Sequence, residues 1–165
     1  VHARQGDLRG GLVAPGGGDD LLERRELYAF GWEGVLWTNV GGTWREVGSP
    51  TRLILNDGAA AIDKVYLGGQ LGIILEGRGE TWRAVDNPES DSDIWSVRTF
   101  DGATYFSTAR GILKLEKGHV STFARPNPGM RATLNLFVGP TGLWSVSARD
   151  IALFDGEGWT TIAQT

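Results

Sequence analysis

The sequence predicts an all-β fold built from short antiparallel strands. Glycine is unusually common, at 25 of 165 residues, and the glycines separate short runs of β-branched and aromatic residues, as in chains with many tight turns. No stretch shows the sustained 3.6-residue apolar period of an amphipathic helix. The segment from Asp20 to Leu27 has the pattern of a short helix, but its place in the repeat described below favours a strand at Leu21–Leu22.

Composition limits the class of protein and of partner. A hydrophobic fraction of 41% and a charged fraction of 22% are typical of a soluble globular domain. The net charge of -4, without any basic stripe, argues against nucleic acid as a partner. No apolar run approaches the roughly 20 residues of a membrane-spanning helix. The absence of cysteine excludes disulfides, a thiol nucleophile and a cysteine-based zinc site, but leaves the cellular compartment open.

A repeat of 38 to 39 residues runs through the chain. Its leading aromatic residues, spaced by 38, 39 and 39 positions, are Tyr28, Tyr66, Tyr105 and Trp144. The residues that open the middle apolar run of each copy are Gly34, Gly72, Gly111 and Asp150. The residues that begin the last strand of each copy are Trp44, Trp82, Val120 and Trp159. Coincident spacing at several landmarks indicates four copies of one structural unit.

Each copy holds four short strands. In the second copy we expect them near 53–56, 64–68, 72–76 and 81–85, with tight turns at Asn56–Gly58 and Glu76–Gly79. Four antiparallel strands in every ~40 residues are the signature of β-propeller blades. A single blade cannot bury both faces of its sheet, so neighbouring blades cover each other.

The domain boundaries follow from the repeat. We expect one β-propeller domain over 19–165, whose blades cover about 19–50, 51–88, 92–126 and 132–165. Residues 1–18 are expected to form a leader or a strand of an adjoining blade. The four blades either close a small ring or form a partial ring, which would close with another copy or with further residues. An open ring would leave two blade faces exposed.

Two segments carry a resemblance to known repeat families. The sequences GGTW (41–44) and GETW (79–82), each followed by an alternating strand, resemble BNR-type repeats, whose Asp-box ends in Gly-x-Thr-Trp, and the Ycf48-like photosystem assembly-factor propellers. The aspartate of the box falls at Asn39 and Gly77, so the box is degenerate. Residues 102–123 and 142–162 resemble the bacterial propeller repeats in periplasmic domains of two-component sensors. The resemblance covers about 20–165 and implies the fold, whereas this repeat type serves many functions.

Functional residues are expected where the copies differ, because residues that recur in register build the core. The recurring Trp44, Trp82 and Trp159 are therefore expected to pack between blades. The hairpin tips before the middle apolar runs share one register, so they should form one rim of the propeller. Trp32 lies at the first tip, where the other copies carry a glutamine or an alanine, and it could stack on a sugar or anchor a partner. The candidate rim residues are Trp32, Glu33, Gln70 with its neighbour Leu71, Arg110, Arg149 and Asp150.

Two links between copies are also candidates. Phe123–Arg131 is stiffened by two prolines and carries Arg125, Met130 and Arg131, which suits a protein contact, the alternative being an ordinary linker. Asp86–Asp93 is rich in carboxylates that could bind calcium. Its spacing fits no calcium-loop pattern, so a solvated loop is favoured, and no metal or cofactor is predicted.

Catalysis has little support in the sequence. The histidines are His2, in the expected leader, and His119, in an expected turn, and no catalytic motif accompanies them. We therefore predict a non-catalytic propeller that binds a protein, as an assembly factor or as an inhibitor of the immunity type. The alternative is a ligand-sensing or carbohydrate-binding propeller. A glycoside-processing enzyme, which needs two apposed carboxylates, has least support. Self-association is expected if the ring is incomplete.

Overall fold

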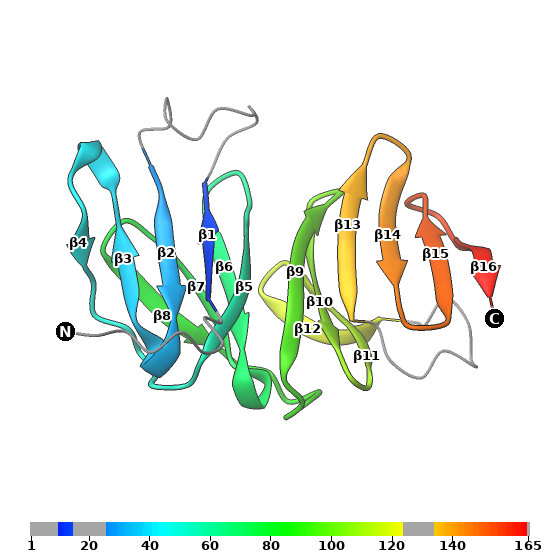
Figure 1. Cartoon of the computed structure of the whole chain (residues 1–165), viewed down its shortest axis with the longest axis horizontal. Helices are drawn as coiled ribbons and strands as arrows, with labels where there is room; N and C mark the ends of the chain where they lie inside the picture. The colour runs from blue at the N-terminus through cyan, green and yellow to red at the C-terminus, as the bar shows by residue number, and fades with distance from the viewer. Residues whose placement is uncertain (1–9, 15–25, 124–133, 165) are drawn as a thin grey trace.

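The computed structural model describes residues 10–14, 26–123 and 134–164. These residues form four antiparallel sheets of four strands, and in each sheet the strands lie side by side in chain order (Figure 1). The first sheet holds β1 (Gly10–Val13), β2 (Tyr28–Gly31), β3 (Leu36–Thr38) and β4 (Arg45–Glu46). The second holds β5 (Leu55–Ala60), β6 (Val65–Gly69), β7 (Ile74–Arg78) and β8 (Thr81–Val85). The third holds β9 (Ile94–Phe100), β10 (Ala103–Thr108), β11 (Gly111–Glu116) and β12 (His119–Phe123). The fourth holds β13 (Asn135–Gly139), β14 (Gly142–Val146), β15 (Asp150–Phe154) and β16 (Trp159–Gln164).

The predicted all-β fold with four propeller-like blades is confirmed. Helical structure in the described residues is confined to the short 3-10 turns η1 (Trp32–Gly34), η2 (Val40–Gly42) and η3 (Gln70–Gly72). No helix in the described part of the chain has the length and apolarity needed to cross a membrane.

One predicted turn is wrong. Asn56–Gly58 lies inside β5, which pairs with β6 through a bulge between Leu55 and Asp57. The chain turns later, where the Ala61 amide donates to the Lys64 carbonyl at 2.7 Å. The turn propensity of Asn-Asp-Gly is overridden by contacts with the next sheet, because the Asp57 carboxylate accepts a hydrogen bond of 2.9 Å from the Val97 amide.

The first sheet begins earlier in the chain than the sequence predicts. Its first strand is Gly10–Val13, which pairs with β2 from Gly10 opposite Gly31 to Val13 opposite Tyr28. This strand lies in the segment that the sequence analysis assigned to a leader or to an adjoining blade. The predicted strand at Leu21–Leu22 falls outside the described residues. The observed strand carries the apolar pair Leu12–Val13, which follows two glycines and does not fall on the repeat spacing.

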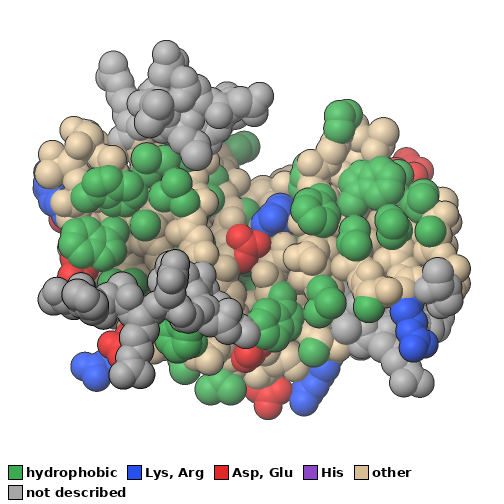
Figure 2. All heavy atoms as spheres, viewed as in Figure 1, with side chains coloured by type: hydrophobic (Ala, Val, Ile, Leu, Met, Phe, Trp, Pro, Cys, Tyr) green, Lys and Arg blue, Asp and Glu red, His purple; other side chains and the backbone are tan. Residues whose placement is uncertain are grey.

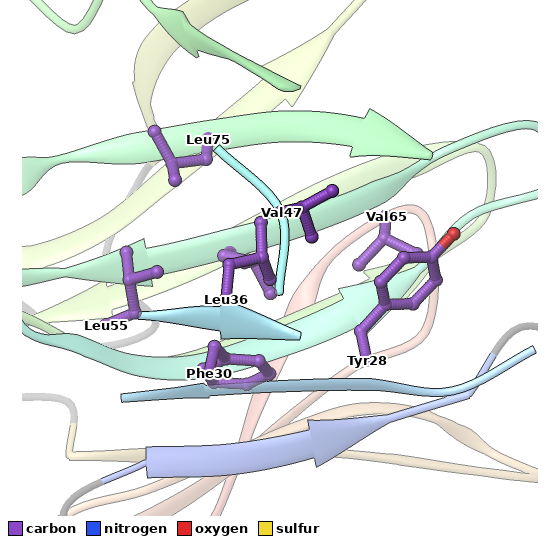
Figure 3. Close-up of a cluster of buried hydrophobic side chains, with 8 residues drawn as sticks. Tyr28, Phe30, Leu36, Val47, Leu55, Val65 and Leu75 are labelled. Atoms are coloured by element: carbon purple, nitrogen blue, oxygen red, sulfur yellow. The ribbon is translucent and has the colours of Figure 1, made fainter. Parts of the chain in front are cut away.

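The core lies between the sheets and consists of three clusters. The first joins the first two sheets and contains Tyr28, Phe30, Leu36, Val47, Leu55, Val65, Leu67 and Leu75, of which seven are labelled in Figure 3. The second joins the second and third sheets and is centred on Ile74, Ile94, Val97, Phe106 and Leu113. The third joins the third and fourth sheets and contains Ala103, Tyr105, Ile112, Leu136, Leu143 and Phe154. Each inner blade therefore buries both faces against its neighbours.

The first strands of successive blades are also joined by polar contacts. Arg98 and Asp57 form an ion pair of 2.7 Å between β9 and β5. One blade later, the Leu136 amide donates to the hydroxyl of Ser96 at 3.2 Å. These contacts recur about 40 residues apart and fix the order of the blades around a common inner edge.

The sheets form an open arc rather than a closed ring. The first sheet packs on the second, the second on the third, and the third on the fourth, whereas strands of the first and fourth sheets do not pack on each other within the described ranges. Figure 1 accordingly shows β4 and β16 at opposite ends of the molecule. The partial ring that the sequence left open is thus the observed arrangement.

Candidate functional site: the hairpin-tip rim

The four hairpin tips between the second and third strands of each blade lie along one edge of the arc, the lower edge in Figure 1. The first two have the same geometry. Gly31 donates to the Val35 carbonyl at 3.2 Å, and Gly69 donates to the Ile73 carbonyl at 3.1 Å. The middle residue of each tip, Glu33 or Leu71, has a positive φ, of 54° and 52° respectively. This conformation turns the middle side chain outward toward solvent, which explains the exposure of both residues.

Glycine is required after each of these middle residues. A Cβ on Gly34 would lie 2.1 Å from the Thr51 carbonyl oxygen, and one on Gly72 would lie 2.2 Å from the Ser90 carbonyl oxygen. Thr51 and Ser90 belong to the links that lead to the next blade. The first two tips are therefore packed tightly on these links, so tip and link form one continuous surface.

In the last two tips, a side-chain hydroxyl group accepts a hydrogen bond from a backbone amide of the turn. The amide of Arg110 donates to the hydroxyl of Thr108 at 3.1 Å, and the amide of Arg149 donates to the hydroxyl of Ser147 at 3.2 Å. Thr108 and Ser147 are equivalent in the repeat, so both arginines are presented by the same local turn. Both arginines are exposed.

Tips and links enclose two shallow hollows on this edge. The first, of about 490 Å³, lies between the Trp32–Val35 tip and residues 46–52. The second, of about 440 Å³, lies between Leu71, Arg110 and residues 87–91. The second hollow brings the tips of two neighbouring blades together, as their shared register predicts.

The acidic link of 86–93 is held by the protein itself. Asp93 accepts from the Leu71 amide at 3.0 Å, and Asp91 pairs with Arg110 at 3.1 Å. Glu89 accepts from the Thr122 hydroxyl at 2.6 Å. Within the described ranges, no three acidic or histidine residues are grouped so that they could hold a metal ion. These contacts tie the link to the second-blade tip at Leu71, to the Arg110 tip and to β12 of the third blade.

The structure places the predicted rim residues in two groups. Trp32 is 48% exposed beside exposed Glu33, and the side chain of Leu71 is 65% exposed next to the Arg110 tip. Gln70 is directed inward, since its side-chain oxygen accepts from the Ile54 amide at 3.1 Å. Asp150 is only 6% exposed, because it begins β15 and its amide donates to the Ser147 hydroxyl at 3.0 Å. Both differ from the expectation that they belong to the exposed rim.

Arg125, Met130 and Arg131 lie outside the described residues. Glu89 and Asp91 join neighbouring blades but were not predicted to, because a charged link gives no sign of which residue each carboxylate will contact. The positive φ of Leu71 was not predicted from the sequence either. Leu71 corresponds to Glu33 in the repeat, and this equivalence could have indicated that it lies at an exposed tip.

Of the three recurring tryptophans, two pack between blades and one is exposed. Trp82 packs edge-to-face on Tyr28 of the preceding blade, with ring centroids 5.3 Å apart. Trp159 packs on Phe123 of the preceding blade at 6.0 Å. These two confirm the predicted packing between blades. The prediction is wrong for Trp44, which is 42% exposed because the described residues place no blade before the first sheet.

The contact between the first two blades shifts the pKa values of Tyr28 and Glu26. Burial, together with a hydrogen bond to Glu26, raises the pKa of Tyr28 to about 12. Burial opposes ionisation of Glu26, but its hydrogen bonds to Arg78 and Tyr28 outweigh this and lower its pKa. Arg78 holds Glu26 through contacts of 3.0 and 2.7 Å. The Tyr28 hydroxyl also accepts from the Gly79 amide. These hydrogen bonds join the first blade to the second.

Comparison with known proteins gives one relative and a shared fold. No family model matches the chain. The chain is 39% identical over 139 residues to the Immune protein Tsi7 of Pseudomonas aeruginosa, which covers 84% of this chain and 45% of that protein. The chain therefore spans less than half the length of this curated relative.

Solved structures show the same architecture. The structure titled YCF48 bound to D1 peptide matches with a TM-score of 0.67 and 15% identity, covering 96% of this chain and 54% of that one. The WD40 beta propeller domain of Doa1 matches with a TM-score of 0.63 and 14% identity, covering 98% of this chain and 55% of that one. At these identities the likeness shows the β-propeller fold. The finer resemblance to BNR-type and sensor repeats stays a prediction.

Proposed function

We propose that this chain is a non-catalytic β-propeller module of the immunity type, which neutralises a toxic protein by binding it through the hairpin-tip rim. The observation that carries the proposal is the 39% identity to an Immune protein over 84% of the chain. That likeness favours an inhibitor over an assembly factor, the two roles that the sequence analysis left side by side.

The shape of the rim supports a protein as the partner. Its hollows are shallow, and each is bordered by a large exposed apolar side chain, Trp32 in one and Leu71 in the other. Tryptophan and arginine are the residues most enriched among those that dominate binding energy at protein interfaces. Arg110 and Arg149 lie on the same edge and add charge around the apolar centres.

The exposed arginine pair also suggests the charge of the partner surface. Arg110 already meets Asp91, so its charge is partly matched within the chain. Arg149 is exposed at the neighbouring tip. A partner surface with carboxylates opposite Arg149 and an apolar centre opposite Trp32 and Leu71 would complement this rim.

The proposal is tested in two steps with the same variants. The immobilised chain first captures its partner from cells, and the captured protein is then expressed alone and with the chain while growth is measured. We expect the captured protein to stop growth and the chain to restore it.

Trp32→Ala combined with Arg149→Glu should abolish the rescue while the protein remains folded. The matched control is Ile62→Ala, which removes an apolar side chain that is 98% exposed at the β5–β6 turn, on the opposite edge. A captured protein without toxicity, or a rescue that the rim variant leaves intact, would overturn the proposal.

A further inference from the structure

Leu71, at the tip of the second blade, combines an apolar side chain with a backbone conformation that such residues rarely adopt. Its φ is 52°, in the left-handed region, where a bulky non-glycine residue is an outlier. Its side chain is nevertheless 65% exposed. Neighbouring blades cover both faces of the second sheet, so this exposure is not that of a sheet at the end of the arc. Leu71 therefore gains little burial within the chain that would offset its backbone conformation.

The other described residues with this conformation are charged. Among the residues that the structure describes, the non-glycine residues with a positive φ besides Leu71 are Glu33, Asp101 and Lys117, and all three are exposed. A charged side chain is well solvated at such a turn, and aspartate is among the residues that tolerate the left-handed region. Neither reason applies to leucine, so the stability of the fold does not account for Leu71. Backbone strain of this kind is found preferentially at functional sites.

Hydrogen bonds to the 86–93 link hold the tip in this conformation. The Leu71 amide donates to the Asp93 carboxylate at 3.0 Å. The side-chain amide of Asn87 donates to the carbonyl of the next residue, Gly72, at 2.8 Å. The Leu71 side chain is thus presented to solvent by a fixed backbone, so little conformational entropy is lost when a partner binds it.

The surroundings of Leu71 have the layout of an interface centre. Leu71 borders the hollow of about 440 Å³ together with Pro88 and the Asp91–Arg110 ion pair. The side chains of Asp91 and Arg110 are 79% and 71% exposed, so charged groups lie beside the apolar one. Figure 2 shows the same mixture along the lower edge of the molecule, where hydrophobic side chains lie next to acidic and basic ones. An apolar centre with a polar rim is the usual anatomy of a protein interface.

We propose that Leu71 is the apolar anchor through which the hairpin-tip rim binds its protein partner, and that the partner presents a closed apolar pocket that takes up the leucine side chain. This proposal rests on the proposed function, because it takes the rim as the binding surface. The pocket supplies the burial that Leu71 lacks in the free chain, and the Asp91–Arg110 pair lies at its margin. The strained backbone keeps the side chain directed toward the partner before binding.

Substitution by asparagine separates the anchor from the fold. Asparagine tolerates the left-handed region better than leucine, so Leu71→Asn should unfold at the same temperature as the native chain or at a higher one. The same variant should bind the protein captured by the immobilised chain about tenfold more weakly or worse, as measured by calorimetry, because the burial of the leucine side chain is lost. Leu71→Met, which keeps an apolar side chain of similar size, should recover most of the affinity.

The matched control is Lys117→Asn. Lys117 has the same φ of 52° and is exposed, but it lies in the turn between β11 and β12, on the edge opposite the rim. The same substitution should therefore change the unfolding temperature in the same direction and leave the affinity for the captured protein unchanged.

Native affinity in Leu71→Asn would overturn the anchor, and so would an equal loss of affinity in Lys117→Asn. A lower unfolding temperature in Leu71→Asn would contradict the strain on which the anchor rests. If Trp32→Ala weakens binding while Leu71→Asn does not, the rim stays the binding surface and only the anchor fails. If neither variant weakens binding, or if the chain captures no protein, the rim and the anchor fail together. Toxicity of the captured protein does not enter this test.

Discussion

The covered faces between blades and the hairpin-tip rim are built from the same repeat, but they use it in opposite ways. Between blades, the leading aromatics Tyr28 and Tyr105 recur in register and are buried. On the rim, equivalent residues differ from copy to copy: exposed Trp32 corresponds to inward-directed Gln70, and exposed Leu71 corresponds to Glu33. The comparison indicates that recurrence marks packing where a neighbouring blade covers the residue, and that the residues of the rim that depart from recurrence are exposed.

The largest expected effect is on a covered face. Phe106 is fully buried between the second and third blades, so Phe106→Ala should lower the free energy of unfolding by about 3–5 kcal/mol. Chemical denaturation measures this loss. A loss below about 1 kcal/mol, the range of surface substitutions, would show that the face is not a packed core.

A smaller effect is expected where a covered face carries a hydrogen bond. Tyr28→Phe keeps the ring against Trp82 but leaves the Gly79 amide without the hydroxyl that accepts its hydrogen bond. The expected loss of unfolding free energy is about 1–3 kcal/mol. Hydrogen exchange at the Gly79 amide should accelerate in this variant, and unchanged exchange there would contradict the assignment.

The contact between Glu26 and Arg78 makes part of the stability depend on pH. The folded-state pKa of Glu26 lies below its ordinary value of 4.5, so the stabilisation is present above that value and is lost as the pH falls through the folded-state pKa. Glu26→Gln should therefore be less stable than the native chain at neutral pH, and the difference should shrink on acidification below about pH 4.5. Thermal unfolding across this range checks it, and a difference that stays constant with pH would contradict it.

The smallest effect on stability is expected on the rim. Arg110 and Asp91 are both exposed, and such ion pairs contribute roughly 0–1 kcal/mol. Asp91→Asn should therefore leave the unfolding free energy nearly unchanged. It should still alter binding of a partner, because it frees Arg110 from its internal partner. Denaturation and partner titration of the same sample separate the two effects.

The repeat allowed the fold to be predicted because its spacing survives substitution of individual residues. Three landmarks placed four blades even though the third copy carries Val120 where the others carry Trp. The turn at Asn56–Gly58 was mispredicted because Asp57 binds Val97 and Arg98, a contact about 40 residues away that local propensity cannot reveal. The strand at Gly10–Val13 was not assigned to the first blade because it lies outside the repeat spacing.

The sequence could predict which repeat positions lie on the candidate edge, but not the contacts that the side chains at those positions make. The register indicated that Trp32, Arg110 and Arg149 belong to one edge. It could not show that Gln70 binds the Ile54 amide or that Asp150 is buried, since both depend on how each tip meets its neighbouring link. Trp44 is exposed because the described residues place no blade on the outer face of the first sheet, and no local pattern records this.

The most direct test of the central claim, that the hairpin-tip rim is the surface that recognises a protein, is the affinity for the captured partner measured by calorimetry. Trp32→Ala should weaken binding by about tenfold or more, which corresponds to about 1.4 kcal/mol or more, while the unfolding curve stays that of the native chain. Ile62→Ala should bind like the native chain. Equal affinity for the native chain and Trp32→Ala, combined with a loss in Ile62→Ala, would contradict the claim and move the recognition surface to the opposite edge.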